Sequence, residues 1–185
     1  QNVADAIMRA KVGVDLGNVS FDMEVHDMEI YADPLLEKVF YYLISNSLKY
    51  GGPKLTQIRI YRKKTDDKMV ILFEDDGVGI SQEKKGYLFP KEWGSRKHAG
   101  YGLFLIRETL GVTGITIWES GTPGQGARFE IAVPKGVFRQ NNLNIFFKKQ
   151  VKILPEFSID HNGLFLKGDL FFGFFHGFLN HIAYS

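Results

Sequence analysis

The chain has 185 residues, of which 44% are hydrophobic and 24% are charged, as is ordinary for a globular domain. Its 23 basic and 21 acidic residues leave a formal net charge of +2, so nothing in the charge balance predicts nucleic-acid binding. Because the chain has no cysteine, disulfides, thiolate metal sites and cysteine nucleophiles are excluded.

The first thirty residues predict one helix and two strands. Apolar side chains at helical spacing predict a helix over residues 2–12, which Gly13 ends. Apolar and polar side chains alternate over residues 19–25, which indicates a strand with one buried face. A second short strand is predicted over residues 29–32.

A longer amphipathic helix follows over residues 34–50. Asp33 and Pro34 are typical of a helix start, since Asp can cap free amides and Pro suits the first helical position. At about 100° per residue, one face of this helix is predicted to be buried. That face consists of Leu36, Val39, Phe40, Leu43, Ile44 and Ser47.

The next ninety or so residues predict four strands and a helix. The strands cover residues 57–63, 69–74, 114–119 and 128–133, and the helix covers residues 102–110. Together with the earlier elements they predict an α+β two-layer sandwich, in which helices cover one face of a mixed, mostly antiparallel sheet.

The end of the chain differs in composition. Residues 137–185 hold 10 of the 16 phenylalanines. Their longest apolar run is about half the roughly 20 residues that a membrane helix needs. So many phenylalanines predict burial against the domain, another chain or lipid. The alternative is that this segment is not a selected sequence, in which case it is expected to promote aggregation. The side chains expected to be buried are those of Phe165, Phe171, Phe174 and Phe178.

The flank of the 34–50 helix carries the first candidate chemistry. Asn46 offers a neutral oxygen of the kind that Mg²⁺ accepts beside phosphate oxygens and water. Lys49, one turn later, can hold a phosphate as a point charge. Taken alone, the same two residues equally suit the solvated face of an amphipathic helix.

Two glycine-containing motifs follow. Asp75, at a predicted strand end, can accept a hydrogen bond from an exocyclic amine, and Gly77 and Gly79 let a flat ring approach the backbone. Gly100 and Gly102 open a helix whose free amides attract phosphate. Each motif by itself is also typical of a tight turn or a plain helix start.

In order and spacing, these motifs closely resemble the N, G1 and G2 boxes of the catalytic ATP-binding domain of sensor histidine kinases. The matching stretches are residues 36–51, 74–80 and 100–107. The resemblance extends over roughly residues 15–134, including a reduced F box that ends at Phe89. It implies the Bergerat fold, which gyrase-type, mismatch-repair and chaperone ATPases share.

The resemblance also implies a role for each motif residue. Asn46 would ligate Mg²⁺ and Lys49 would contact phosphate. Asp75 would accept from the adenine amine, with Gly77 and Gly79 shaping the floor beneath the ring.

The remaining implied contacts concern the phosphates of ATP. Gly100, Gly102 and the amide of Leu103 would cradle them. Residues 80–99 would form a lid over the nucleotide, from which Lys97 would reach phosphate unless it is simply solvated.

Three positions depart from the family's usual pattern. Tyr42 stands where Asn is common, which predicts weakened or rearranged Mg²⁺ binding. Ala99 and Ala127 stand where hydroxyl residues are frequent, and each loses a hydrogen bond worth about 1 kcal/mol. Phe89, in contrast, is expected to anchor the lid rather than to touch the nucleotide.

The resemblance implies a three-part chain. Because it begins at Gln1 rather than Met, the chain is expected to be a fragment of a longer protein. Residues 1–14 are expected to end a preceding helical dimerisation domain, and residues 15–136 to form the ATP-binding domain. Residues 137–185 form a Phe-rich extension of unknown role.

The implied function is that of a protein-histidine kinase in a two-component phosphorelay. Such a module binds ATP and Mg²⁺ and transfers the γ-phosphate to a histidine on the dimerisation domain, from which a response regulator receiver domain takes it. The acceptor histidine is expected outside this chain, so the chain alone is expected to be inactive. A cytoplasmic location is expected, whether or not the parent protein is anchored in a membrane.

Two alternatives remain on the sequence. One is a non-catalytic nucleotide-sensing module of the same fold. The other is a hydrolytic ATPase, which is disfavoured because such enzymes place a water-activating Glu where Tyr42 stands, and a phenol is no base near neutral pH. The nearest preceding acid, Glu37, falls on a different face of the helix from Asn46.

Overall fold

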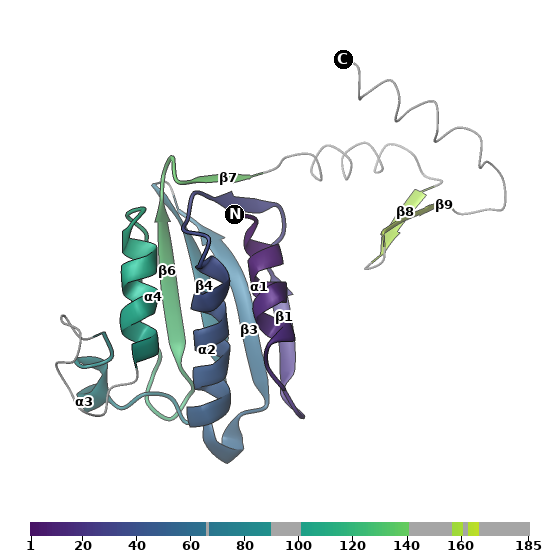
Figure 1. The fold of residues 1–185 in the computed structure, drawn as a ribbon. Helices are drawn as coiled ribbons and strands as arrows, with labels where there is room; N and C mark the ends of the chain where they lie inside the picture. The colour runs from purple at the N-terminus through teal and green to yellow at the C-terminus, as the bar shows by residue number, and fades with distance from the viewer. Residues whose placement is uncertain (66, 90–100, 141–156, 161–162, 167–185) are drawn as a thin grey trace. The chain divides into compact units, whose positions relative to one another are not determined.

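A computed structural model describes residues 1–65, 67–89, 101–140, 157–160 and 163–166 (Figure 1). The chain divides into two compact units, Gln1–Asn141 and Asn142–Ser185. The candidate site lies in the first unit.

A five-stranded sheet forms one layer of the first unit, in the order β1-β3-β4-β6-β5. The strands are β1 (Ser20–Glu24), β3 (Gln57–Lys64), β4 (Lys68–Asp75), β5 (Thr116–Glu119) and β6 (Arg128–Pro134). β1 pairs with β3 in parallel, and all other neighbours pair antiparallel. The predicted mixed, mostly antiparallel sheet is thereby confirmed.

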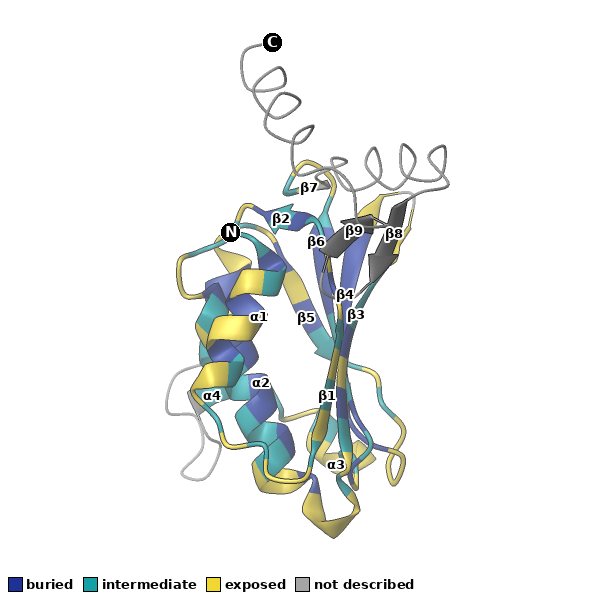
Figure 2. Cartoon of the chain, turned by 90° about the vertical axis from the view of Figure 1, so that its right-hand side faces the viewer, coloured by how far each residue is buried: buried dark blue, intermediate teal, exposed yellow. Residues whose placement is uncertain are grey.

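Three helices cover one face of this sheet, so the predicted two-layer sandwich is also confirmed (Figures 1 and 2). They are α1 (Val3–Val12), α2 (Leu36–Tyr50) and α4 (Tyr101–Gly111). Two short elements, the 3₁₀ turn η1 (Gly52–Lys54) and α3 (Gln82–Lys85), lie in the connections. α2 begins later than predicted, because Asp33 Oδ1 accepts the Leu35 N–H and closes a turn ahead of the helix.

The core lies between the helices and the sheet (Figure 2). All six residues predicted for the apolar face of α2 are buried. Opposite them, alternate residues of β4 point inward, and Met69, Ile71 and Phe73 have no exposed surface. Phe73 meets Phe129 of β6 edge to face, with ring centroids 6.4 Å apart. This contact joins β4 to its neighbour β6.

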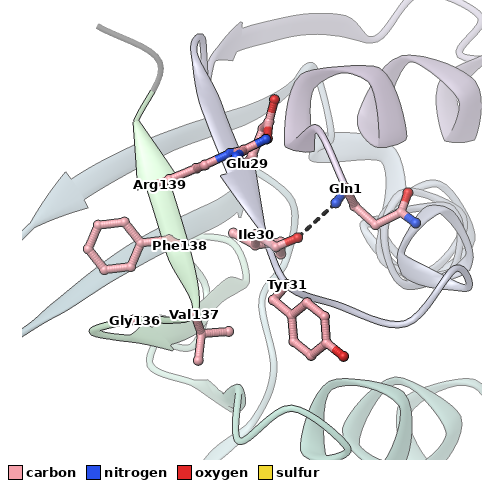
Figure 3. Close-up of a pocket in the computed structure, with 8 residues that line it drawn as sticks. All are labelled: Gln1, Glu29, Ile30, Tyr31, Gly136, Val137, Phe138 and Arg139. Atoms are coloured by element: carbon pink, nitrogen blue, oxygen red, sulfur yellow. Dashed lines mark hydrogen bonds and ion pairs between the residues drawn. The ribbon is translucent and has the colours of Figure 1, made fainter.

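A two-stranded ribbon lies at the end of the unit remote from α3 (Figure 1). It pairs β2 (Met28–Ile30) with β7 (Phe138–Gln140), a strand beyond residue 136 that no sequence pattern predicts. Arg139 Nη2 lies 2.5 Å from Glu29 Oε2 across the ribbon. A cavity of about 300 Å³ lies beside the ribbon. In it, the amino group of Gln1 donates to the Ile30 carbonyl (Figure 3).

The second unit contains a hairpin of β8 (Phe157–Asp160) and β9 (Gly163–Leu166). The predicted burial of four phenylalanines falls largely outside the described residues. Phe171, Phe174 and Phe178 lie there, and of Phe165 only its place in β9 is described. Within the described parts of the chain, no helix has the length and apolar character needed to cross a bilayer.

α1 lies against α2 and shares its core. Its apolar side contains Val3, Ala6, Ile7 and Ala10, all of them buried. Arg9 Nε donates to Glu37 Oε2 of α2 at 3.2 Å. The helix that the sequence assigns to a preceding domain lies within the unit Gln1–Asn141, with its apolar side packed against α2.

We expect Ile7→Ala to lower the free energy of unfolding by about 2 to 4 kcal/mol, because the removed atoms leave a cavity between α1 and α2. Urea denaturation of the full chain measures the change. Met8→Ala is the matched control, since Met8 is 46% exposed on the same helix and should cost far less. Equal small effects from both variants would show that α1 contributes nothing to the domain.

Candidate functional site

Asp75 is the best-defined polar residue of the site. It ends β4 with only 9% of its surface exposed. Its Oδ1 accepts the N–H groups of Gly77 and Ala127, each at 3.0 Å, and its Oδ2 accepts the Ser47 hydroxyl at 2.6 Å. A carboxylate offers about four acceptor positions, so these bonds fix its orientation and leave room for one further donor.

Ser47 is a site residue that sequence reasoning missed. It belongs to the buried face of α2 and is only 4% exposed, and its hydroxyl reaches across to Asp75. A buried hydroxyl almost always has a hydrogen-bond partner. A serine among Leu, Ile and Phe on the same face was the signal that could have identified it.

Three turns interlock beside Asp75. The Val78 N–H donates to the Gly51 carbonyl at 2.9 Å, and the Gly124 N–H donates to the Val78 carbonyl at 2.9 Å. Lys54 Nζ also donates to the Gly124 carbonyl, at 2.8 Å. The turns after α2, after β4 and before β6 therefore support one another.

Close backbone packing explains the predicted glycines of this loop. A Cβ on Gly77 would lie 2.7 Å from the Cα and carbonyl oxygen of Gly51. Gly79 has a φ of +69°, and a Cβ there would lie 2.8 Å from the Gly126 carbonyl oxygen. Both glycines are thus required by the protein itself, and their predicted contact with an adenine ring stays a prediction.

Asp76 has a different environment from its neighbour Asp75. Its Oδ1 accepts the N–H groups of Thr56 and Gln57 at 2.7 and 2.9 Å, and its Oδ2 accepts the Thr56 hydroxyl at 2.5 Å. Burial by itself raises the pKa of the Asp76 carboxyl, but the hydrogen bonds from Thr56 and Gln57 together lower the pKa below its usual value. Asp76 therefore secures the loop to the start of β3.

α2 connects the three sequence motifs in space. Through Ser47 it contacts Asp75, as described above. Through Tyr42 it contacts α4, since a Cβ on Gly102 would lie 3.1 Å from the Tyr42 ring. Asn46 lies between these two contacts along the helix and is partly buried. No residue in the described part of the chain hydrogen-bonds to its side chain.

The structure describes only some of the other residues that were predicted to contact phosphate. Lys49 is exposed on the last turn of α2, with its ammonium 5.0 Å from the centroid of the Tyr50 ring. Gly102 and Leu103 lie in the first turn of α4, where helix amides are free. Lys97 and Gly100 lie outside the described residues, as does Ala99.

The oxygen ligands that the site offers limit how Mg²⁺ could be bound. Among the described residues, no three His, Asp or Glu side chains gather where they could hold a metal ion. The single amide oxygen of Asn46 does not make a cage for a free cation. It fits an Mg²⁺ that takes its other ligands from nucleotide phosphates and water.

The segment after Gly79 is attached to the core through Phe89. The Phe89 ring meets Phe129 edge to face, with centroids 6.4 Å apart, and the Phe89 carbonyl accepts from Arg107 Nη1 at 3.0 Å. The structure thus agrees with the expectation that Phe89 anchors the segment.

Comparison with known proteins agrees with this geometry. Residues 32–137 match the family described as histidine kinase-, DNA gyrase B-, and HSP90-like ATPases. Phytochrome-like protein Cph1 of Synechocystis is 29% identical over 122 residues, 62% of this chain and 16% of Cph1. Alginate biosynthesis sensor protein KinB of Pseudomonas aeruginosa is 34% identical over 125 residues, 63% of this chain and 20% of KinB.

A solved structure shows the same fold. The mycobacterial sensor histidine kinase MprB superposes with a TM-score of 0.63 at 17% identity, over 76% of this chain and 97% of that one. The chain spans a fifth or less of the length of Cph1 and KinB.

Proposed function

Because this chain belongs to the family of histidine kinase-, DNA gyrase B-, and HSP90-like ATPases, we propose that it is the catalytic ATP-binding domain of a sensor histidine kinase. In this proposal the domain binds ATP with Mg²⁺ and presents the γ-phosphate to a histidine on a separate dimerisation domain. The observation that carries it is the buried Asp75 carboxylate, which three donors hold in place beside the helix that bears Asn46.

Each part of the site has a task suited to its chemistry. The unfilled acceptor position of Asp75 receives the adenine amine, and the first-turn amides of α4 face the phosphates. Asn46 would hold the Mg²⁺ and Lys49 a phosphate oxygen. When bound, the metal neutralises phosphate charge. Phosphoryl transfer depends mainly on such positioning and charge neutralisation, so these groups are chemically sufficient.

The described residues favour transfer over hydrolysis. Tyr42, one turn before Asn46, packs on Gly102 and has no carboxylate with which to activate water. Glu37 is engaged elsewhere, because its carboxylate accepts from Arg9 of α1. A hydrolytic ATPase is therefore the less favoured hypothesis.

A non-catalytic nucleotide sensor is the second candidate. It is favoured by the Tyr42 ring, which fills the space between α2 and the first turn of α4 at a position where the family commonly has Asn. A catalytic domain should bind ATP more tightly with Mg²⁺ than without it. A sensor that has lost metal binding should show no difference.

We also propose the partners that this function requires. They are a histidine-bearing dimerisation domain of the same protein, through which the full-length kinase is a dimer, and the receiver domain of a response regulator. We place the domain in the cytoplasm, where ATP is available. KinB, which is 34% identical to this chain, is itself named a sensor protein.

We expect the isolated chain to bind ATP in the presence of Mg²⁺ and neither to phosphorylate itself nor to release ADP steadily. The reason is that Tyr42, not an acid, lies one turn before Asn46, and that His26, the histidine within the described residues, lies between β1 and β2 rather than on a helix. Calorimetry with and without Mg²⁺ measures binding, and radiolabelled ATP measures transfer. Absence of ATP binding would end the proposal, and acid-labile phosphate on one of its five histidines would refute its account of the acceptor.

A further inference from the structure

A buried ion pair lies close to the nucleotide site. Lys85 Nζ of α3 is 2.7 Å from Glu119 Oε2 at the end of β5, and the two side chains are 16% and 1% exposed. Ion pairs on the surface contribute little, but a charge this buried needs its partner. α3 has only four residues, too few to be stable as an isolated helix, so its position depends on contacts of this kind.

The same two side chains hold the turn between β5 and β6. Glu119 Oε1 accepts the Gly121 N–H at 2.9 Å and lies 3.4 Å from the Arg128 amide nitrogen. Lys85 Nζ also donates to the Gly121 carbonyl. Glu119 and Lys85 thus satisfy both backbone groups of Gly121 and fix the point where the turn begins.

The far end of that turn rests on Asp75. The Ala127 N–H donates to Asp75 Oδ1 and the Asp75 N–H donates to the Ala127 carbonyl, both at 3.0 Å. Next to it, Gly126 packs directly on the Asp75 backbone carbonyl. A continuous series of contacts therefore runs from α3 through the ion pair and the turn to the Asp75 carboxylate.

We propose that Lys85 and Glu119 are positioning residues of the nucleotide site, which hold the turn so that Asp75 can select adenine. The inference rests on the proposed function. The ion pair also has a second effect in this proposal. By fixing α3, it helps Phe89 to hold the beginning of the 80–99 segment against the sheet.

The test compares charge removal with charge retention. The double variant Lys85→Met/Glu119→Gln removes both charges without leaving either one buried and unpaired. Lys85→Arg keeps the ion pair, and Lys84→Met removes an exposed lysine from the same helix. For each protein, calorimetry measures the Kd for ATP and for GTP with Mg²⁺, and a thermal melt without nucleotide measures stability.

The double variant is expected to bind ATP about tenfold more weakly than the wild type and to lose a similar factor in its preference for ATP over GTP. Lys85→Arg and Lys84→Met should stay within about twofold of the wild type. If the double variant does not fold, Lys85→Gln/Glu119→Gln, which also removes both charges but keeps a polar group at each position, gives the same comparison.

A folded double variant with wild-type Kd values for both nucleotides would overturn the inference, even if it melted at a lower temperature, because the pair would then serve stability alone. Failure of the wild-type chain to bind ATP would instead refute the proposed function. The two failures are therefore distinguishable.

Discussion

Asp75→Asn is expected to abolish the preference for ATP over GTP and to weaken ATP binding about 10- to 100-fold. The Gly77 and Ala127 N–H groups both point at Oδ1, so the amide oxygen must remain there. The new NH₂ group then takes the place of Oδ2, beside the Ser47 hydroxyl. It would present a donor where the adenine amine also presents a donor, and the acceptor oxygen of guanine would be tolerated.

Calorimetric titration with ATP and GTP measures this change in selectivity. Asp76→Asn is the matched control, because Asp76 is the adjacent acid but bonds to Thr56 and Gln57 instead of facing the site. The control should lower stability and leave the ratio of the two affinities unchanged. If Asp75→Asn also left that ratio unchanged, Asp75 would not be the adenine acceptor.

Gly126→Ala is expected to lower the free energy of unfolding by more than about 3 kcal/mol and to eliminate measurable ATP binding. Gly126 has a φ of +101°, which is strained for any L side chain. Its Cβ would also collide with the Asp75 backbone carbonyl. The turn could then relax only by moving away from the carboxylate that it supports.

Gly124→Ala separates the effect of backbone strain from the effect of the collision with Asp75. Gly124 belongs to the same turn and has a φ of +83°, but no atom lies within 4 Å of its Cβ position. This control has the backbone strain without the collision, so it should cost about 1 to 2 kcal/mol and keep ATP binding. Urea denaturation and ATP titration of both variants provide the measurement. Equal losses in the two would show that strain, and not contact with Asp75, is responsible.

The elements with a regular apolar period were predictable from the sequence. Leu36, Phe40 and Leu43 mark the buried face of α2 because a helix repeats every 3.6 residues, and that period does not depend on what lies opposite. β4 was predictable from a different signal, the continuous run of apolar residues over 69–73. Its end at Asp75 followed from the glycines of the next loop.

The features that were not predictable depend on a partner distant in sequence. β7 forms because Phe138 pairs with Ile30, which lies more than a hundred residues earlier in the sequence. Lys85 appears in the sequence as one of two adjacent lysines, and only the fold brings Glu119 to it. Asn46, Asp75 and Gly102 could be chosen for their chemistry, whereas the support that Asp75 receives from Ser47 and Ala127 required the three-dimensional arrangement.

The position of the N-terminus has a consequence for the proposed phosphoryl transfer. Gln1 lies beside the β2–β7 ribbon, at the end of the domain opposite α3 (Figures 1 and 2). α2 runs between the two ends, and its 15 residues span about 22 Å. Gln1 therefore lies at the end of the domain remote from the first turn of α4, where the proposed phosphate contacts are. In the proposed kinase, an acceptor histidine would therefore approach the phosphates at the end of the domain opposite Gln1.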